Sequence, residues 1–254
     1  MVLPRTPSFR LDGKRALVTG GTRGIGLGAA VALAEAGAAV TVAARTAPDV
    51  EAVVNEMAAA GLPAEGVALD ITDSEAVAVF VEDVDMFDIL VNSAGTARHS
   101  DFADITPEDY RAVMDVNLAA TIFVSQAVVG TLVAAGKPGS IIHISSQMGH
   151  VGGPRRAVYA ASKHAVEGLT KAMAIELGPN NIRVNTVCPT FVETELTARN
   201  LSDPDFRSWV LSKIKLGRLG RVEDLMGPIV FLASDAAALV TGTSLLVDGG
   251  WTAE

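Results

Sequence analysis

Tyr159 and Lys163 are the residues whose types and spacing point most directly to chemistry. They are four residues apart in a segment patterned as a helix, so they share one helix face and the ammonium can lie beneath the phenol. A tyrosine has a pKa of about 10, and service as acid and base near neutral pH requires a fall of about 3, or roughly 4 kcal/mol. A neighbouring ammonium can supply stabilisation of that order. The same spacing also occurs by chance on surface helices, so this interpretation depends on the residues around the pair.

A glycine-rich segment, Thr19-Gly20-Gly21-Thr22-Arg23-Gly24-Ile25-Gly26, lies between an apolar strand pattern and a helix pattern. Glycines let the backbone turn tightly and approach a pyrophosphate, which then lies at the positive end of the helix dipole. The alternative is a tight strand-to-helix turn that binds no ligand. A strand before it, a helix after it and a second strand about 20 residues further along favour a dinucleotide site.

The end of the second expected strand indicates which dinucleotide is bound. NAD-dependent enzymes commonly place an acidic residue there to bind the ribose hydroxyls, whereas this chain has Ala44 followed by Arg45. Arg23 adds a second guanidinium, and two such groups suit a 2′-phosphate because bidentate, charge-assisted hydrogen bonds are strong. Two solvated surface arginines are the alternative. We therefore expect NADP(H) as the preferred cofactor, with NAD(H) possible.

The elements that must position these residues follow from an alternation of short apolar runs and longer helix-patterned segments. The expected strands are Ala16–Thr19, Ala39–Ala43, Gly66–Leu69, Ile89–Val91, Ser140–Ile144, Arg183–Val187 and Ser244–Val247. The expected helices lie near Ile25–Ala36, Asp49–Ala60, Ser74–Val84, Pro107–Ala135, Ala160–Leu177 and Glu223–Leu232. Continuously apolar strands indicate burial on both faces. The pattern predicts an α/β fold: a Rossmann-type, doubly wound, seven-stranded parallel sheet with helices on both faces.

One domain is expected, because no repeat or low-complexity linker interrupts the pattern. Residues 1–13 are expected to form an N-terminal arm and residues 14–254 the dinucleotide-binding catalytic domain. The longest irregular stretch, about residues 189–220, follows the sixth strand, and long loops in compact domains are often lids over a site. Ser208–Ile214 within it could form a short helix.

Composition argues against several classes of partner. The chain of 254 residues has 20 Lys and Arg against 29 Asp and Glu and no basic block, which disfavours nucleic acid and anionic membranes. The N-terminus lacks a signal-peptide pattern and no run of about 18 apolar residues occurs, so we expect no membrane span. The single Cys188 and the four histidines show no metal-ligand spacing, so we expect no metal. A reducing cytoplasm fits a single cysteine.

Taken together, the motifs resemble the short-chain dehydrogenase/reductase family, in its single-domain branch of about 250 residues. The resemblance extends from Leu11 to Gly250. The family's glycine motif is met at residues 19–26, and Asn92-Ser93-Ala94-Gly95 corresponds to its Asn-Asn-Ala-Gly motif. Where the family often has Pro-Gly after the sixth strand, this chain has Pro189-Thr190, so Thr190 either narrows the pocket or offers a hydroxyl to the substrate.

The resemblance implies an oxidoreductase that interconverts a carbonyl and a secondary alcohol by hydride transfer with a nicotinamide. It implies that Tyr159 donates or accepts the proton, and that Ser146, thirteen residues earlier, hydrogen-bonds the reacting oxygen. Lys163 would hold the nicotinamide ribose and lower the tyrosine pKa. Asn117 would anchor a water that links Lys163 to solvent.

The cofactor contacts implied by the resemblance come from the glycine turn, the strand ends and the proton-transfer pair. They are Gly20, Thr22, Arg23, Gly24, Ile25, Gly26, Arg45, Asp70, Ile71, Asn92, Ala94, Gly95, Tyr159, Lys163, Pro189, Val192 and Thr194. Asp70 is similar to the family's adenine-binding carboxylate, although a turn residue that leads into a helix is the alternative.

Residues after Ser146 and in the lid are expected to line the substrate pocket. They are Gln147, His150, Arg155, Phe191 and Trp209, together with Met148 and Leu196, and with Arg98 and His99 after the fourth strand. Gln147, His150 and Arg155 could hydrogen-bond a sugar, a polyol or a sugar acid. Arg155 and Arg156 could equally be surface-loop charges.

Two other functions stay open on sequence alone. One is reduction of a 3-oxoacyl group on acyl carrier protein, which the formal charge of −9 disfavours because that partner is acidic. The other is a non-catalytic NADP sensor, which would usually lack the tyrosine or the lysine.

We also expect a homo-oligomer. Pro107–Ala135 carries apolar residues beyond one stripe, and the C-terminal segment around Leu245 and Trp251 is apolar. The resemblance favours a tetramer, with a dimer as the alternative.

Overall fold

Seven parallel strands form one sheet in the order β3-β2-β1-β4-β5-β6-β7. The computed structural model describes residues 3–253. The strands are β1 (Arg15–Thr19), β2 (Ala39–Ala44), β3 (Ala64–Ala68), β4 (Ile89–Asn92), β5 (Gly139–Ile144), β6 (Ile182–Pro189) and β7 (Ser244–Val247). The order reverses between β1 and β4, as a doubly wound sheet requires, so the predicted fold is confirmed.

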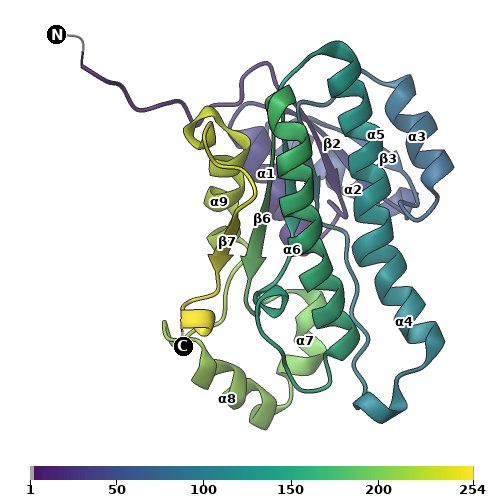
Figure 1. Ribbon diagram of the computed structural model, residues 1–254, viewed down its shortest axis with the longest axis vertical. Helices are drawn as coiled ribbons and strands as arrows, with labels where there is room; N and C mark the ends of the chain where they lie inside the picture. The colour runs from purple at the N-terminus through teal and green to yellow at the C-terminus, as the bar shows by residue number, and fades with distance from the viewer. Residues whose placement is uncertain (1–2, 254) are drawn as a thin grey trace.

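Helices cover both faces of the sheet (Figure 1). One apolar cluster joins the sheet to α1 (Gly24–Glu35), α2 (Ala47–Ala59) and α9 (Glu223–Ala233). The other joins it to α3 (Ser74–Asp83), α5 (Ala120–Ala135) and α6 (Ala157–Leu177). Alternate strand residues point to opposite clusters, since Ala16 and Val18 belong to the first and Leu17 to the second. This explains why the strands are apolar throughout.

Several element boundaries differ from the expected ones, among them those of β3, α6 and the long helix Pro107–Ala135. The edge strand β3 begins at Ala64, which pairs with Val40 of β2, rather than at Gly66, because hydrogen bonding to the neighbour decides the start of an exposed strand. The helix α6 begins at Ala157, before Tyr159. The expected helix Pro107–Ala135 consists of α4 (Pro107–Met114), a π-helical turn η2 (Asp115–Ala119) and α5. Such turns are often found at functional sites.

The stretch of residues 189–220 is more regular than predicted. It contains α7 (Glu195–Leu201) and α8 (Pro204–Lys213). The short helix expected at Ser208–Ile214 is present as part of the longer α8, whereas α7 was not expected. Each helix has a strong start signal: Thr194 forms a capping box, and Asp203 accepts backbone hydrogen bonds ahead of Pro204. A separate apolar cluster that includes Val210 and Trp251 holds this segment against the domain.

Short helical turns complete the description. They are η1 (Phe102–Asp104), η3 (Gln147–Gly149), η4 (Gly178–Asn180), η5 (Asp235–Ala237) and η6 (Trp251–Ala253). At the other end of the chain, the N-terminal segment extends away from the sheet (Figure 1). Phe9 contacts the ring of Phe231 at 6.3 Å, and Leu11 is buried.

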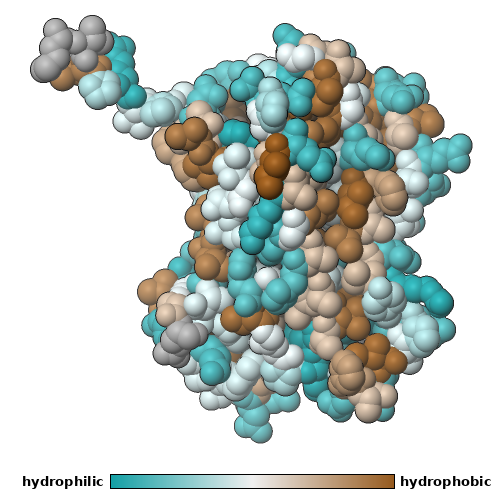
Figure 2. Space-filling model, in the orientation of Figure 1, coloured by the Kyte–Doolittle hydropathy of each residue, from teal (hydrophilic) through white to brown (hydrophobic). Residues whose placement is uncertain are grey.

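The continuous helix Pro107–Ala135 is long and apolar enough, by length and composition alone, to cross a membrane. A core helix passes the same test, and here Val124, Val128 and Leu132 pack in the cluster on the sheet. Apolar side chains also run along the outer side of α5, where brown surfaces are visible in Figure 2. Phe123 and Val133 are among the exposed ones.

His143 on β5 is a buried titratable group in the middle of the sheet. Its Nδ1 accepts a hydrogen bond from the Asn92 side-chain amide at 3.1 Å. Burial, followed by the charge of Lys163, lowers the pKa of His143 to about 4. The folded protein therefore holds this imidazole neutral.

We predict that His143 makes the protein less stable below neutral pH. The unfolded chain binds a proton near pH 6.5 and the folded chain does not, so stability falls by about 1.4 kcal/mol for each pH unit between that value and 4. Urea unfolding of wild type and His143→Gln from pH 7 to about 5 measures the difference, which we expect to be about 2 kcal/mol. Equal pH dependence of the two proteins would contradict this assignment.

Candidate active site

The predicted chemical residues meet at the carboxyl ends of the central strands. The glycine turn follows β1, Asn92 ends β4, Ser146 follows β5 and Pro189 ends β6. These four strands include the point where the strand order reverses, and open parallel sheets bind ligands in the crevice at that point.

The glycine turn lies against the end of β4 at backbone distance. Gly20 has a φ of +65°, and a Cβ built there would lie 2.7 Å from Ala94 Cα. A Cβ on Gly26 would collide with the carbonyl oxygen of Gly20. Thr19 links the same two segments, because its hydroxyl oxygen accepts hydrogen bonds from the N–H groups of Ser93 and Ala94 at 3.2 and 3.4 Å. The glycines are therefore required by packing as well as by the turn.

The start of α1 offers backbone donors to an anion. Within residues 3–253 no side chain caps α1, and its first turn contains no acidic residue. The first backbone N–H groups of a helix lack partners inside the helix, and the helix dipole makes that end positive. Glycine at positions 20, 24 and 26 keeps the approach clear. This donor set fits the pyrophosphate of a dinucleotide.

The residues expected to choose between NADP and NAD lie beyond this turn. Arg45 is exposed at the end of β2, and Arg23 is exposed with its guanidinium 3.9 Å from the Glu195 carboxylate. Asp70 accepts hydrogen bonds from the Thr72 N–H and hydroxyl, which lower its pKa, with a smaller contribution from the charge of Arg45. Asp70 is thus a turn residue close to Arg45, while its neighbour Ile71 is buried.

Asn117, in the turn η2, ties together the segments around the proton-transfer pair. Its side-chain oxygen accepts the Thr96 N–H at 2.8 Å, and its amide donates to the Thr96 carbonyl and to the Ser162 hydroxyl at 2.9 and 3.1 Å. A Cβ on Gly95 would lie 3.5 Å from Asn117 Oδ1 and 3.9 Å from Lys163 Nζ. The loop after β4, the turn η2 and α6 therefore meet at Lys163.

Ser146, Tyr159 and Lys163 lie together, as the sequence predicts. The Lys163 ammonium is buried, donates to the Ile144 carbonyl at 2.8 Å and lies 5.8 Å from the centre of the Tyr159 ring. The Ser146 hydroxyl donates to the Gln147 side-chain oxygen at 2.7 Å and accepts the Met148 N–H at 3.1 Å. These contacts fix Ser146 beside the tyrosine.

Burial dominates the ionisation of this group. It raises the pKa of Tyr159, although a hydrogen bond with Ser146 and the charge of Arg156 oppose the rise. It lowers the pKa of Lys163 to about 8. Near neutral pH the tyrosine is therefore protonated and the lysine charged, which is the state that can give a proton to a bound oxygen.

The segment after β6 lies beside the glycine turn. Val192 bridges to Gly220 through the backbone, and Thr194 caps α7. A Cβ on Gly24 would lie 3.4 Å from Thr194 Cγ2, so the start of α7 touches the glycine turn. Thr190, in the place of the family's glycine, is buried, and its hydroxyl has no hydrogen-bond partner within the described residues.

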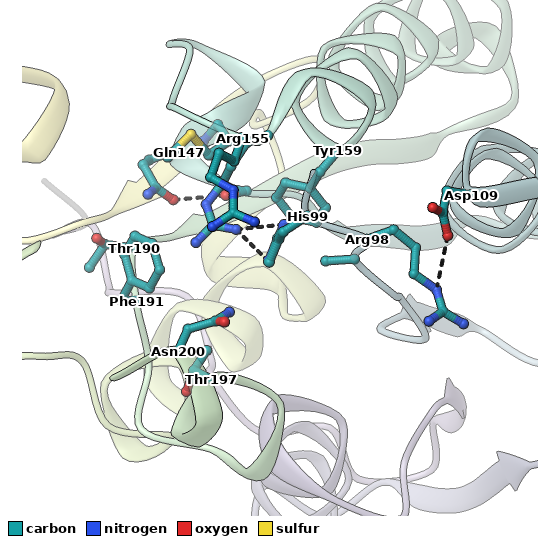
Figure 3. Close-up of a pocket in the computed structure, with 14 residues that line it drawn as sticks. Arg98, His99, Asp109, Gln147, Arg155, Tyr159, Thr190, Phe191, Thr197 and Asn200 are labelled. Atoms are coloured by element: carbon teal, nitrogen blue, oxygen red, sulfur yellow. Dashed lines mark hydrogen bonds and ion pairs between the residues drawn. The ribbon is translucent and has the colours of Figure 1, made fainter. Parts of the chain in front are cut away.

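A pocket of about 570 Å³ opens beside Tyr159 (Figure 3). Its lining residues are Ala97, Arg98, His99, Asp109, Ser146, Gln147, Met148, Arg155, Arg156, Tyr159, Thr190, Phe191, Thr197 and Asn200. In Figure 3, Gln147, Thr190 and Phe191 lie on one side, Arg98 and Asp109 on the other, and Thr197 and Asn200 come from α7. The pocket is rich in polar and cationic side chains.

Of the five residues expected to bind substrate, Gln147, Arg155 and Phe191 line this pocket, whereas His150 and Trp209 do not. Trp209 packs edge-on against Trp251, with ring centres 5.4 Å apart. Sequence analysis did not assign Asp109, Thr197 or Asn200 to the pocket, and it left Arg156 as a surface charge. Arg156 had one usable signal, its place three residues before Tyr159.

His150 lies instead beside a buried polar cluster. Its Nε2 is 3.8 Å from the carboxylate of Glu167, which also accepts hydrogen bonds from Thr186, Ser244 and Cys188. Ligand atoms of His150, Glu167 and Cys188 lie within 4.8 Å of one another, a proximity that sequence spacing did not reveal. Burial raises the pKa of the Cys188 thiol to about 12, so this thiol stays protonated near neutral pH.

Comparisons with known proteins cover almost the whole chain. A family model described as enoyl-(acyl carrier protein) reductase matches residues 20–252. The D-erythrulose reductase of Gallus gallus is 43% identical over 245 residues, covering 96% of this chain and 98% of that protein. The L-xylulose reductase of Bos taurus is 42% identical over 245 residues, covering 96% and 99%.

A solved structure is similar over the same length. The gluconate 5-dehydrogenase from Burkholderia cenocepacia J2315, in complex with NADP and tartrate, is 39% identical, with a TM-score of 0.93 and coverage of 97% of this chain and 98% of that chain. Sequence, fold and strand-end motifs thus agree over nearly the full length, and the chain belongs to the short-chain dehydrogenase/reductase family of oxidoreductases.

Proposed function

We propose that the protein interconverts the carbonyl and secondary-alcohol forms of a small sugar, polyol or sugar acid, by hydride transfer with NADP(H). The observation that carries this proposal is the meeting of Ser146, Tyr159 and Lys163 beside a glycine turn whose donors fit a dinucleotide. The bound nicotinamide supplies or accepts the hydride. The relatives named for erythrulose, xylulose and gluconate support the substrate class.

Tyr159 is the proposed acid and base. In the direction of reduction its phenol gives a proton to the carbonyl oxygen of the substrate, and in oxidation the phenolate takes one from the alcohol. Ser146 donates a hydrogen bond to the same oxygen after its hydroxyl turns away from Gln147, to which it now donates. Lys163 favours the phenolate by its charge and holds the nicotinamide ribose. Asn117 keeps Lys163 in place and anchors a water beside it.

The cofactor is proposed to lie along the strand ends, with its pyrophosphate at the start of α1. Gly20, Thr22, Gly24, Ile25 and Gly26 form the turn around it. Arg23 and Arg45 would hold a 2′-phosphate, which supports NADP(H) over NAD(H), and the Burkholderia relative is described with NADP. The remaining proposed contacts are Asp70, Ile71, Asn92, Ala94, Gly95, Pro189, Val192 and Thr194.

Two features support this function over the alternatives. A carrier-protein substrate is acidic, and this chain carries a formal charge of −9, so their approach is electrostatically unfavourable. A non-catalytic sensor has no need of a buried lysine beside a half-buried tyrosine, since burial of the lysine ammonium costs stability. The proposed lid over the substrate is the segment with α7 and α8, and the proposed location is the cytoplasm.

Replacing the phenol tests the proton-transfer role. We expect Tyr159→Phe to lower turnover by a factor of about 100 to 10,000, the usual effect of losing general acid–base catalysis, while NADPH still binds. Nicotinamide absorbance gives the rate, and nicotinamide fluorescence gives the binding. The chain's other tyrosine, Tyr110, is exposed on α4, so Tyr110→Phe is the matched control and should be as active as wild type. Wild-type turnover in Tyr159→Phe would contradict the assignment.

Replacing Arg45 tests the cofactor preference. We expect Arg45→Gln to raise the KM for NADPH about tenfold, because a charge-assisted hydrogen bond to the 2′-phosphate is lost, and to leave the KM for NADH nearly unchanged. Initial rates at varied cofactor and fixed substrate provide both constants. If both KM values move together, Arg45 does not read the 2′-phosphate.

We also propose a homo-oligomer, with a tetramer favoured over a dimer. Phe123 and Val133 on α5, Ile175 on α6 and Leu246 on β7 are exposed apolar side chains that self-association would cover. Sedimentation velocity should therefore give a mass that is a multiple of the 26.2 kDa chain. A monomer at micromolar concentration would refute the proposal.

A further inference from the structure

Arg156 is a buried guanidinium in the pocket with no acidic partner. Its residue is 6% exposed, and within the described residues no carboxylate lies at ion-pair distance from it. The other two arginines of the pocket differ in both respects. Arg98 is exposed and lies 3.8 Å from Asp109, and Arg155 is exposed and lies 3.6 Å from Asp101.

The neighbours of Arg156 hold it in place without neutralising it. Its Nη1 contacts both ring nitrogens of His99, at 2.7 Å for Nδ1, as dashed lines in Figure 3 mark. Its guanidinium lies 5.4 and 5.5 Å from the ring centres of Phe191 and Phe206. Burial, followed by the charge of Arg156, lowers the pKa of His99 to about 4, so this histidine is neutral near pH 7.

A fixed, unpaired cation in a buried place is energetically costly. An arginine does not shed its proton under ordinary conditions, so the cost cannot be removed by neutralisation. Proteins tolerate such a buried charge where an anionic ligand binds and forms an ion pair with it. Besides its contacts with the two aromatic rings and His99, the guanidinium has further N–H donors. A planar fork of such donors matches the two oxygens of a carboxylate.

The position of Arg156 assigns that anion to the reacting molecule. Arg156 caps α6 three residues before Tyr159, about one helical turn away, and lines the same pocket as Ser146 and Tyr159. The arginines proposed for the cofactor, Arg23 and Arg45, do not line this pocket. An anion bound by Arg156 is therefore part of the substrate rather than of the dinucleotide.

A second group in the pocket also lacks its partner. The hydroxyl of Thr190 is buried and makes no hydrogen bond within the described residues, although buried hydroxyls are nearly always paired. Asn200 and Thr197, from α7, add polar side chains to the lining. These groups suit the hydroxyls of a polyhydroxylated molecule.

We propose that the substrate of this enzyme is a sugar acid whose carboxylate is bound by Arg156, with Thr190 hydrogen-bonding an adjacent oxygen. This inference rests on the proposed function and narrows it, because it excludes neutral sugars and polyols as preferred substrates. One guanidinium matches the single charge of a carboxylate, and the two other arginines of the pocket already have aspartate partners. A phosphorylated sugar, with about two negative charges, would be left partly uncompensated.

The test compares an aldonate with the alditol of the same chain length. Wild type should have the higher kcat/KM for the aldonate. We expect Arg156→Gln to lower kcat/KM for the aldonate about 100-fold, mainly through KM, and to change that for the alditol less than about threefold. Arg156→Lys retains the charge without the fork and should recover part of the loss. Arg10→Gln, which removes an exposed arginine far from the pocket, should match wild type.

A non-reacting anion gives a readout that does not depend on turnover. Propionate, a monocarboxylate with no alcohol or ketone group to react, should inhibit wild type competitively against the aldonate and should bind Arg156→Gln at least tenfold more weakly by calorimetry. If Arg156→Gln does not fold, the ratio of aldonate to alditol activity in Arg156→Lys decides the matter.

The two claims fail in different ways. Equal loss of aldonate and alditol activity in Arg156→Gln, or a wild type that prefers the alditol, overturns the carboxylate inference and leaves hydride transfer standing. Preference for a sugar phosphate over the aldonate also overturns it. Propionate binding that depends on Arg156, in a protein with no nicotinamide-dependent turnover of any sugar, would overturn the proposed function and retain the anion site.

Discussion

The site depends on the backbone contact between the glycine turn after β1 and the end of β4. Gly20 lies so close to Ala94 that a side chain at residue 20 would separate the two strand ends. Because they touch, the donor end of α1 and the loop that reaches Lys163 share one crevice. Dinucleotide binding and proton transfer are therefore coupled by packing in the sheet rather than by a flexible loop.

Around that contact the protein buries several charged groups, and these groups differ in the partners that surround them. The Glu167 carboxylate receives hydrogen bonds from Thr186, Ser244 and Cys188, which together outweigh its burial and lower its pKa. Lys163 donates to a backbone carbonyl and lies near a tyrosine ring, and burial lowers its pKa to about 8. Among the described residues, the partners of Arg156 are a neutral histidine and aromatic rings. A buried charge that is balanced by partners inside the protein stabilises the fold, whereas a buried charge without such partners can bind a ligand.

Local sequence patterns were enough to predict the features that depend on residues close together in the chain. The strand alternation predicted the seven-stranded parallel sheet. The glycine turn and Ser146 lie just beyond strand ends, and Tyr159 and Lys163 lie four residues apart in α6. The segment after β6 was harder, since its two helices depend on packing around Val210 and Trp251, far apart in sequence. For the same reason Trp209, expected in the pocket, packs against Trp251 instead.

The pocket shows the same limit for charged residues. Nothing in a run of two arginines tells which one is buried, because the answer depends on Phe206 and on His99, which come from distant segments. Likewise His150 lies beside Glu167, and the spacing of the two residues in the sequence did not indicate this contact. Long-range packing thus decided which of the predicted polar residues face the substrate and which face the core.

Every role proposed for this site depends on hydride transfer between NADP(H) and a sugar, a polyol or a sugar acid. This transfer is tested most directly by nicotinamide absorbance, with the purified protein, NADP(H) and NAD(H) in parallel, and a panel of sugars, polyols, sugar acids and 3-oxoacyl thioesters. We expect saturable turnover of a sugar acid with NADP(H) and weaker turnover with NAD(H). Turnover confined to thioesters, or no turnover of any sugar, polyol or sugar acid, would contradict it.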